Sequence, residues 1–404
     1  MEAEIVVVRL EGVQVILVSI LVLWLGIFLN RKVSVLNNYN IPVPVSGGLI
    51  CSLAVTGLYV FAQVEVDFDL TTRDTLLIVF FSTVGLSAKF HRLVEGGRSL
   101  AILLVIAVFF LVFQNLIGTF VATSIGIHPA AGLIGGSISF AGGHGTAITW
   151  GQIFAERYGM VRAVDIGIAC ATFGLILGGL VGGPIAKRLI SVHGLTAEPR
   201  AEAETPGAAH EEKAGPVTVH GMIDATFMIG LCVAVGATTH LWITELGFTL
   251  PGFLTAMFTG IVITNLVDLL KIKVAANATS LISDISLELF LAMSLMSMKL
   301  WTLASAAGPI LVVLILQVVL IVLFAYFVVF RLMGRDYDAC CITVGFAGLG
   351  LGATPVGIAN MNALTSKYGA SPKAYLVVPL LGAFFIDIAN AFVIQGLLSL
   401  PFYH

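Results

Sequence analysis

The sequence predicts an all-α membrane protein that crosses the bilayer many times, with two inverted-topology repeats of about five transmembrane helices, each carrying a re-entrant, glycine-rich hairpin. Composition is the first reason: 58% of the 404 residues are hydrophobic and 11% are charged, whereas about 25% of a typical soluble chain is charged. The second reason is a series of apolar runs long enough to cross a bilayer. The third is a partial match of the chain to itself at an offset of 210 residues. This composition excludes a water-soluble fold.

Ten apolar runs approach the roughly 20 residues that a helix needs to span a bilayer. The predicted spans lie near residues 13–29, 41–62, 74–89, 99–125, 162–185, 222–243, 249–270, 283–299, 307–331 and 374–397. The N-terminal sequence MEAEIVVVRLEG is acidic, whereas a secretory signal begins with positive charge. We therefore expect the first run to remain as a membrane helix.

Two further segments, 130–152 and 338–361, are too rich in glycine, serine and threonine to be ordinary lipid-facing helices. We expect each to form a re-entrant hairpin, in which irregular backbone at membrane depth is enclosed by protein. The only polar linker covers residues 187–221 and holds nine of the 43 charged residues. It separates an N-terminal membrane repeat, 1–186, from a C-terminal one, 222–404.

Three matching stretches occur in the same order at nearly the same offset, which indicates a duplicated unit. They are Asp74, Leu77, Phe80, Ser87 and Lys89 with Asp284, Leu287, Phe290, Ser297 and Lys299; FAGGHGTA with FAGLGLGATP; and Tyr158-Gly159 with Tyr368-Gly369. An odd number of spans in each unit turns the second copy over in the membrane. With the N-terminus outside, the inner connections receive fifteen lysines and arginines and the outer ones five, as the positive-inside rule requires. The linker is therefore expected to be cytoplasmic and both termini to lie on the outer side.

Interrupted membrane helices free backbone groups that bind substrates and ions in secondary transporters, and glycine lets a ligand approach the backbone closely. The candidate substrate-binding residues in the hairpins are Ser139, Gly142, Gly143, His144, Gly145, Thr146, Gly348, Gly350, Gly352, Thr354 and Pro355. Neutral oxygens and carboxylates suit sodium, a hard cation. The candidate sodium ligands are Thr146, Thr354, Asn360 and Asp387. In the alternative interpretation, the glycines only let helices pack tightly.

Ionisable groups inside membrane segments are candidates for function. His144 could donate a hydrogen bond to an anionic substrate or gate access, or it could be a structural histidine; the sequence favours neither. Asp387 is the deepest acidic group, and Asn390, a further substrate-binding candidate, follows one helical turn later. A cation or a helix end is the favoured partner of Asp387, with a structural ion pair as the alternative. Arg162 is a candidate for binding an anion, although it could instead pair with Asp165 at a helix start.

At GGHGTA, TPVGIANMNALTSKYG and LVVPLLGAFFIDIANAFVI, the chain resembles the bacterial sodium/glutamate symporter family, over nearly its whole length. The resemblance implies sodium-coupled uptake of L-glutamate across the cell inner membrane, a homodimer, and alternating access of the elevator type, in which a hairpin-bearing unit moves against a fixed scaffold. It implies sodium as the coupling ion, without a tightly bound cofactor. It also points to the hairpin tips, Gly142–Thr146 and Gly348–Pro355.

Other functions remain as alternatives. The first is sodium-coupled symport of another small carboxylate, because the hairpin chemistry suits any small anion. An ion–proton antiporter is disfavoured, since such carriers usually depend on paired carboxylates and only Asp387 lies convincingly deep. A membrane-embedded hydrolase using His144 and Asp387 would need a nucleophile or a metal, and the chain contains neither HExxH nor GxSxG. No enzyme activity is therefore expected, and the net charge of −3 without a basic block indicates no nucleic-acid partner.

Overall fold

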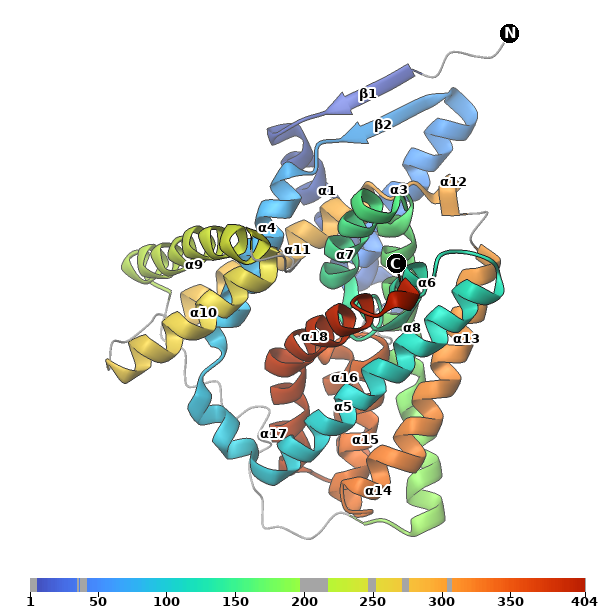
Figure 1. The fold of residues 1–404 in the computed structure, drawn as a ribbon, viewed down its shortest axis with the longest axis vertical. Coiled ribbons are helices and arrows are strands. Elements are labelled where there is room, and N and C mark those ends of the chain that lie inside the picture. Colours follow the sequence, from blue (N-terminus) through green and yellow to red (C-terminus); the bar gives the residue numbers. More distant parts are fainter. Residues whose placement is uncertain are drawn as a thin grey trace. The chain divides into compact units, whose positions relative to one another are not determined.

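The computed structural model describes residues 6–34, 36, 42–196, 217–245, 252–270, 276–303 and 307–403. Within these residues the chain is helical apart from two short strands (Figure 1). Eight helices are long and apolar enough to cross a membrane, or nine if the bent pair Pro372–Ala383 and Ile386–Leu398 counts as one span. The prediction of a helical protein with many membrane spans is confirmed.

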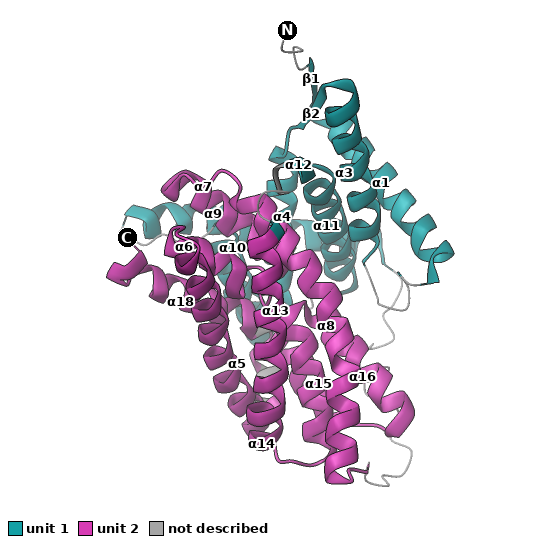
Figure 2. Ribbon diagram, turned by 90° about the vertical axis from the view of Figure 1, so that its right-hand side faces the viewer, with its two compact units in different colours: residues 1–87, 217–307 teal, residues 88–216, 308–404 magenta. Residues whose placement is uncertain are grey.

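The chain folds into two compact units, and each unit combines a segment from each half of the sequence (Figure 2). Unit 1 contains residues 1–87 and 217–307, and unit 2 contains residues 88–216 and 308–404. These units cut across the two halves on either side of the linker. The division of the sequence into two repeats therefore stays a prediction, separate from the division of the structure into two compact units. Most of the linker, 197–216, lies outside the described residues.

Unit 1 consists of seven helices and a two-stranded parallel ribbon among its described residues. Its elements are β1 (Val6–Leu10), α1 (Val13–Lys32), α3 (Val43–Ala62), β2 (Val64–Phe68), α4 (Thr71–Ser87), α9 (Val219–Glu245), α10 (Gly252–Leu269), α11 (Ala276–Met296) and α12 (Leu300–Leu303). The strands pair with Val6 opposite Val64. This ribbon was not predicted from the sequence, because a strand of only five residues gives a weak sequence pattern.

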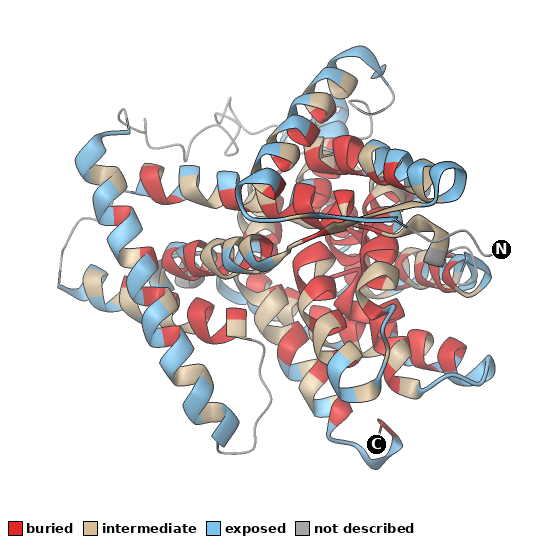
Figure 3. Cartoon of the chain, turned by 90° about the horizontal axis from the view of Figure 1, so that it is seen from above, coloured by how far each residue is buried: buried red, intermediate tan, exposed pale blue. Residues whose placement is uncertain are grey.

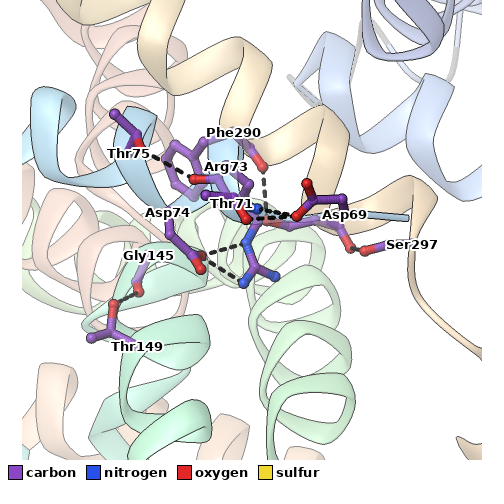
Figure 4. Close-up of polar contacts among 10 residues, drawn as sticks. Asp69, Thr71, Arg73, Asp74, Thr75, Gly145, Thr149, Phe290 and Ser297 are labelled. Atoms are coloured by element: carbon purple, nitrogen blue, oxygen red, sulfur yellow. Dashed lines mark hydrogen bonds and ion pairs between the residues drawn. The ribbon is translucent and has the colours of Figure 1, made fainter. Parts of the chain in front are cut away.

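Side-chain contacts fix the connection between β2 and α4 (Figure 4). The Asp69 carboxylate accepts hydrogen bonds from the Thr71 amide at 3.0 Å and the Thr71 hydroxyl at 2.6 Å. These bonds lower the pKa of Asp69, because they stabilise its charged form. The Arg73 guanidinium donates twice to the Asp74 carboxylate, at 2.8 and 2.6 Å. The polar residues at the start of α4 are thus linked to one another and to Asp69.

Glycines allow the helices of unit 1 to pack at backbone distance. A Cβ added at Gly26 or Gly47 would overlap the facing backbone between α1 and α3, and one added at Gly236 would lie 2.6 Å from the Cα of Ala256 between α9 and α10. A Cβ at Gly85 of α4 would overlap the carbonyl oxygen of Met257 in α10. In unit 1, these glycines therefore serve helix packing, as small residues do between membrane helices.

Unit 2 contains the two interrupted segments. Its described elements are α5 (Phe90–Ser124), α6 (Pro129–Leu133), η1 (Ile134–Ile138), α7 (Gly143–Tyr158), α8 (Ala163–His193), α13 (Ala307–Phe324), η3 (Ala325–Val329), α14 (Phe330–Leu332), α15 (Tyr337–Leu351), α16 (Thr354–Tyr368), α17 (Pro372–Leu380), η4 (Leu381–Phe385), α18 (Ile386–Leu398) and η5 (Pro401–Tyr403). Helix α5 changes direction at Gly97, which has φ 51° and ψ −145°. A kink at this point is expected, because glycine adopts positive φ without strain.

Both predicted hairpins are helices interrupted by a break. In the first, Gly136 leaves the helical region with φ −115° and ψ −139°, and a new helix starts at Gly143. In the second, α15 ends at Leu351 and α16 starts at Thr354. The arms of the second hairpin run side by side, since a Cβ at Gly345 would lie 2.7 Å from the Met361 sulfur and one at Gly348 would lie 2.8 Å from Gly357.

The predicted last span, 374–397, is bent by 47° between α17 and α18. Pro379 lies inside α17, and the π-helical turn η4 follows directly. Proline removes a backbone donor and a π-helical turn widens the ladder, so both bend a helix. A hydropathy pattern does not report this bend, because the residues on either side remain apolar.

Many helices combine a buried face with an exposed apolar face (Figure 3). In α13, Val313, Gln317 and Ile321 are buried, whereas Leu311 and Ile315 are 58% and 55% exposed. Apolar side chains on an exposed face are expected for a helix whose solvent is lipid. The buried face of α13 points toward the hairpins, because a Cβ at Gly135 would lie 3.2 Å from the Val313 side chain.

Gly85→Val is expected to destabilise unit 1 by about 1–3 kcal/mol, because the added side chain overlaps the backbone of α10. Gly57→Val is the matched control, since a Cβ there has open space within 4 Å. The check is the thermal unfolding temperature in detergent, together with the monodisperse fraction on gel filtration. Equal unfolding temperatures for the two variants would contradict the close approach of α4 and α10.

Candidate substrate and ion site

The tips of the two hairpins meet inside unit 2. A Cβ added at Gly143, the first residue of α7, would lie 3.7 Å from the carbonyl oxygen of Gly352 at the second break. Helix α8 supports the second tip, because a Cβ at Gly352 would lie 3.0 Å from the Cα of Leu175. Two breaks that are far apart in the sequence therefore share one region.

The break in the first hairpin is held by two asparagines. The backbone N–H of Ser137 donates to the Asn115 side chain at 3.0 Å, and the Ser137 carbonyl accepts from the Asn390 amide at 3.0 Å. The Ser137 hydroxyl accepts from Asn115 at 2.7 Å and donates to Asn390 at 2.5 Å. Both polar atoms of the Asn390 amide bind Ser137, so in this conformation Asn390 positions the first hairpin.

The four helical arms of the hairpins differ in capping. Each first arm has a side-chain cap: His128 accepts from the Ala130 N–H at 3.2 Å, and Asp336 accepts from the Ala339 N–H at 2.6 Å. The second arms, α7 and α16, start at the tips without a side-chain cap. The first backbone N–H groups of α7 lack intrahelical partners. In α16, Pro355 has no N–H, and the Val356 and Gly357 N–H groups donate to the Ala353 carbonyl at 3.0 and 3.2 Å. The helix dipole makes both helix ends positive. The meeting point of the tips therefore suits an anion.

Two predicted hydroxyls in this region are buried without a hydrogen-bond partner. Ser139 is fully buried and Thr146 is 3% exposed, and neither side-chain oxygen has a partner among the described residues. A buried polar group without a partner costs about 1–3 kcal/mol. Ser139 lies between the break and the tip, and Thr146 lies in the first turn of α7. Both hydroxyls are therefore free to bind a ligand.

His144 is 7% exposed and lies next to Gly143 in α7. Its Nε2 is 3.0 Å from the Thr172 hydroxyl oxygen, and that hydroxyl donates its own proton to the Ile168 carbonyl at 2.8 Å. Because a hydroxyl has one proton, Nε2 must be the donor in this pair. The contact anchors His144 to α8 and leaves Nδ1 as the ring atom without a protein partner among the described residues.

The second tip contacts the bend between α17 and α18. The Thr354 hydroxyl fills the space where a Cβ at Gly382 of η4 would lie. Asp387 stands in the first turn of α18, just after η4, and is partly buried. Within the described part of the chain, no basic side chain forms an ion pair with Asp387, so the alternative of a structural ion pair is not observed there. Thr354 therefore contacts the turn η4, which precedes Asp387 in the sequence.

Other predicted residues serve packing in this conformation. Cβ atoms at Gly350 and Gly142 would lie 2.7 Å from the Phe110 ring and 2.8 Å from the Asn390 amide. Gly348 faces its own hairpin, and Asn360 donates to the Gly178 carbonyl of α8 at 2.9 Å. The two remaining candidates are Gly145, whose carbonyl accepts from Thr149 at 3.0 Å (Figure 4), and the exposed Pro355.

Arg162 lies at the exposed start of α8. The tips contact the same helix at Gly174 and Gly178, which at 1.5 Å per residue is roughly 18–24 Å further along the axis. In this conformation Arg162 therefore does not belong to the group of residues at the tips. Arg162 was a candidate for binding an anion because of its charge alone, and the charge of a residue does not reveal its distance from the hairpin tips.

Three buried residues near the hairpins were missed: Gln114, Asn115 and Gln317. Each interrupts a strongly apolar run, FFLVFQNLIG or ILVVLILQVVLIV. That interruption was a usable signal, because a polar side chain inside a membrane helix requires a partner. Only the fold reveals that the partners are the broken backbones of the hairpins.

Known proteins match this sequence over almost the full length of the chain. Residues 8–370 match the family described as "Sodium/glutamate symporter". The sodium/glutamate symporter of Escherichia coli (strain K12) is 43% identical over 398 residues, covering 98% of this chain and 99% of that protein. The sodium/glutamate symporter of Haemophilus influenzae is 40% identical over 375 residues, covering 92% and 93%. The chain therefore belongs to the sodium/glutamate symporter family.

Proposed function

We propose that the protein is a sodium-coupled glutamate symporter of the cell inner membrane, and that the substrate binds where the two hairpin tips meet. The observation that carries the proposal is the pair of uncapped helix N-termini at this point, beside two buried hydroxyls that lack partners. The names of the related proteins support the identity of the substrate and the ion. Accumulation of labelled glutamate in proteoliposomes is the direct test.

Glutamate has the chemistry that this arrangement accommodates. It carries two carboxylates, and the tips present the N-terminal ends of two helices, α7 and α16. The N-terminus of α7 offers N–H donors to a negative group, and α16 contributes the positive end of its dipole. Ser139 and Thr146 can donate further hydrogen bonds. His144 is fixed through Nε2 and orients the first turn of α7. A basic side chain is not needed at the tips, because the helix ends and the two hydroxyls interact with the carboxylates.

For sodium, we propose a site on the side of the second tip that faces η4. Thr354 and Asp387 supply a hydroxyl and a carboxylate there, and the last carbonyls of α15 lack intrahelical partners. Such hard oxygens suit a hard cation. Thr146 and Asn360 remain further candidates, although the amide nitrogen of Asn360 is already bound to Gly178.

The inverted repeat is supported by the order of the elements. The first half runs α1, α3, α4, α5, α6–η1–α7 and α8; the second runs α9, α10, α11, α13, α15–α16 and α17–η4–α18. Close contacts also repeat: Gly48 of α3 meets Leu295 of α11, and Gly85 of α4 meets Met257 of α10. Gly85 and Leu295 are 210 positions apart, and Met257 is one position short of the counterpart of Gly48.

Each compact unit takes corresponding elements from both halves, which suits alternating access of the elevator type. We propose that unit 2, which holds both hairpins, carries the substrate and that unit 1 is the scaffold of a homodimer. The hairpins would re-enter the membrane, because their freed backbone groups need enclosure by protein. The positive-inside rule supports outer termini and a cytoplasmic linker.

Replacing external sodium by choline or potassium should abolish glutamate accumulation, because the proposed site binds a small hard cation whose gradient drives uptake. The measurement is uptake of labelled glutamate by proteoliposomes under a sodium gradient, with empty liposomes as the control. Equal accumulation under a proton gradient alone would reject sodium coupling.

Gly143→Val should abolish sodium-dependent glutamate binding while the protein stays folded, because the side chain enters the space between the tips. Gly159→Val is the matched control: Gly159 has φ +67°, against +65° at Gly143, and a Cβ there has open space within 4 Å. The two changes therefore introduce similar backbone strain.

Gly350→Val should instead lower the unfolding temperature first, since its side chain meets Phe110 and Ile321. Binding isotherms and thermal unfolding on purified protein distinguish these effects. Wild-type binding by the Gly143 variant would remove the first tip from the site.

The orientation is testable with single cysteines at Ala209, in the linker, and at Ser399, near the C-terminus, in a background in which the partly exposed Cys51 is serine. An impermeant thiol reagent applied to intact cells should label position 399 and spare position 209, because only the outer side is reachable. Labelling at both positions, or at neither, would contradict the proposed inversion; permeabilised cells provide the control for reactivity.

A further inference from the structure

We propose that Gln114 and Gln317 form a crossed bridge that couples the two hairpins, so that sodium bound at one tip strengthens glutamate binding at the other. The two glutamines are positioning residues and contact neither ligand. This inference rests on the proposed function, because it describes how two ligands at the tips influence each other.

Three hydrogen bonds make the bridge. The side-chain amide of Gln114 in α5 donates to the carbonyl of Gly350 in the second hairpin at 2.8 Å. The side-chain amide of Gln317 in α13 donates to the carbonyl of Gly135 in the first hairpin at 3.0 Å and to the backbone carbonyl of Gln114 at 2.8 Å. Both glutamines are fully buried. A continuous path therefore joins Gly135 to Gly350 through the two side chains.

Each glutamine binds a carbonyl at the point where a helix is interrupted. Gly350 lies in the last turn of α15, after Gly348, whose carbonyl accepts from the cap N–H of Gly352. The Gly350 carbonyl is therefore beyond the last intrahelical bond. Gly135 directly precedes Gly136, where the backbone leaves the helical region. The amide orientation is fixed, because only the nitrogen end can donate to a carbonyl. The bridge therefore binds the backbone beside both helix breaks, and a movement of either break would change it.

The bridge is crossed between the two halves of the chain. The long helix of the first half, α5, holds the hairpin of the second half, and the corresponding helix α13 holds the hairpin of the first half. An aromatic cluster encloses it: the Phe110 ring lies 5.2 Å from that of Phe324 and 5.4 Å from that of Phe346. Apolar surroundings strengthen hydrogen bonds and make a broken one expensive.

Stability alone does not explain these residues. The side-chain oxygens of Gln114 and Gln317 are both buried without a partner among the described residues, which costs about 1–3 kcal/mol for each. Gln114 and Gln317 are distinctive in their position, because together they connect one hairpin to the other. A cation that fixes the second tip also fixes the Gly350 carbonyl, and Gln114 and Gln317 pass this restraint to Gly135, four residues before Ser139.

The test measures the coupling itself on purified full-length protein. The glutamate Kd is determined at low and at saturating sodium, and their ratio is the coupling factor, which by linkage equals the effect of glutamate on sodium affinity. We expect Gln114→Leu and Gln317→Leu each to reduce this ratio by about fivefold or more. The double variant should lose no more than either single one, because the bridge fails when either residue is removed. Gln395→Leu is the matched control, a partly buried glutamine of α18 in unit 2 that binds no hairpin.

Each outcome of this experiment either supports or overturns a stated proposal. Unchanged ratios in both single variants would overturn the bridge, and so would equal weakening of glutamate binding at low and high sodium, which marks a purely structural role. If a leucine variant fails to fold, by gel filtration and thermal unfolding, Gln114→Met and Gln317→Met replace it, because methionine keeps the shape without the donors. Absence of any sodium effect in the wild-type protein would instead refute the proposed function.

Discussion

Backbone groups freed by a helix break must find partners inside the protein, because lipid offers none. The two interrupted segments of unit 2 create such groups at Gly136 and around Gly352. Side chains from neighbouring helices satisfy several of them: Asn115 and Asn390 bind the backbone of Ser137, and two glutamines bind carbonyls at the breaks. The remaining elements of the unit are arranged so that these donors reach the breaks.

The groups that stay unsatisfied are as informative as those that are satisfied. The first arms of the hairpins are capped, whereas the second arms begin at the tips without a cap, next to the free hydroxyls of Ser139 and Thr146. A stable protein leaves few buried polar groups without partners. Ser139 and Thr146 are two of the eight buried side-chain atoms without a hydrogen-bond partner among the described residues, and their place beside the first tip supports the proposal that the ligands bind there.

Glycine has two roles in this molecule, and sequence does not separate them. In unit 1, Gly26, Gly47 and Gly85 allow backbones to touch, and added side chains would overlap the neighbouring helix. At the first tip, Gly143 adopts φ +65°, and an added Cβ would lie 3.7 Å from the Gly352 carbonyl oxygen of the second tip. Gly350, in an equally glycine-rich stretch, faces the Phe110 ring. Local conformation and the distance to the next helix decide the role, and both are properties of the folded state.

The sequence by itself determined the membrane class and both interrupted segments, because hydropathy and glycine content are local properties. It predicted ten spans, whereas eight helices among the described residues, or nine with the bent pair, are long and apolar enough to cross a membrane. It also suggested His144, Thr146, Thr354 and Asp387 as site residues, from the oxygen-rich hairpins and from ionisable groups inside membrane segments, and these assignments stay proposals. Only the tertiary structure decided that Asn390 holds a hairpin, that Arg162 lies far along α8, and that α17 and α18 bend at η4. It also brought together Gln114 and Gln317, 203 residues apart. Hydrogen bonds between distant segments depend on how helices pack, and no window of sequence contains that information.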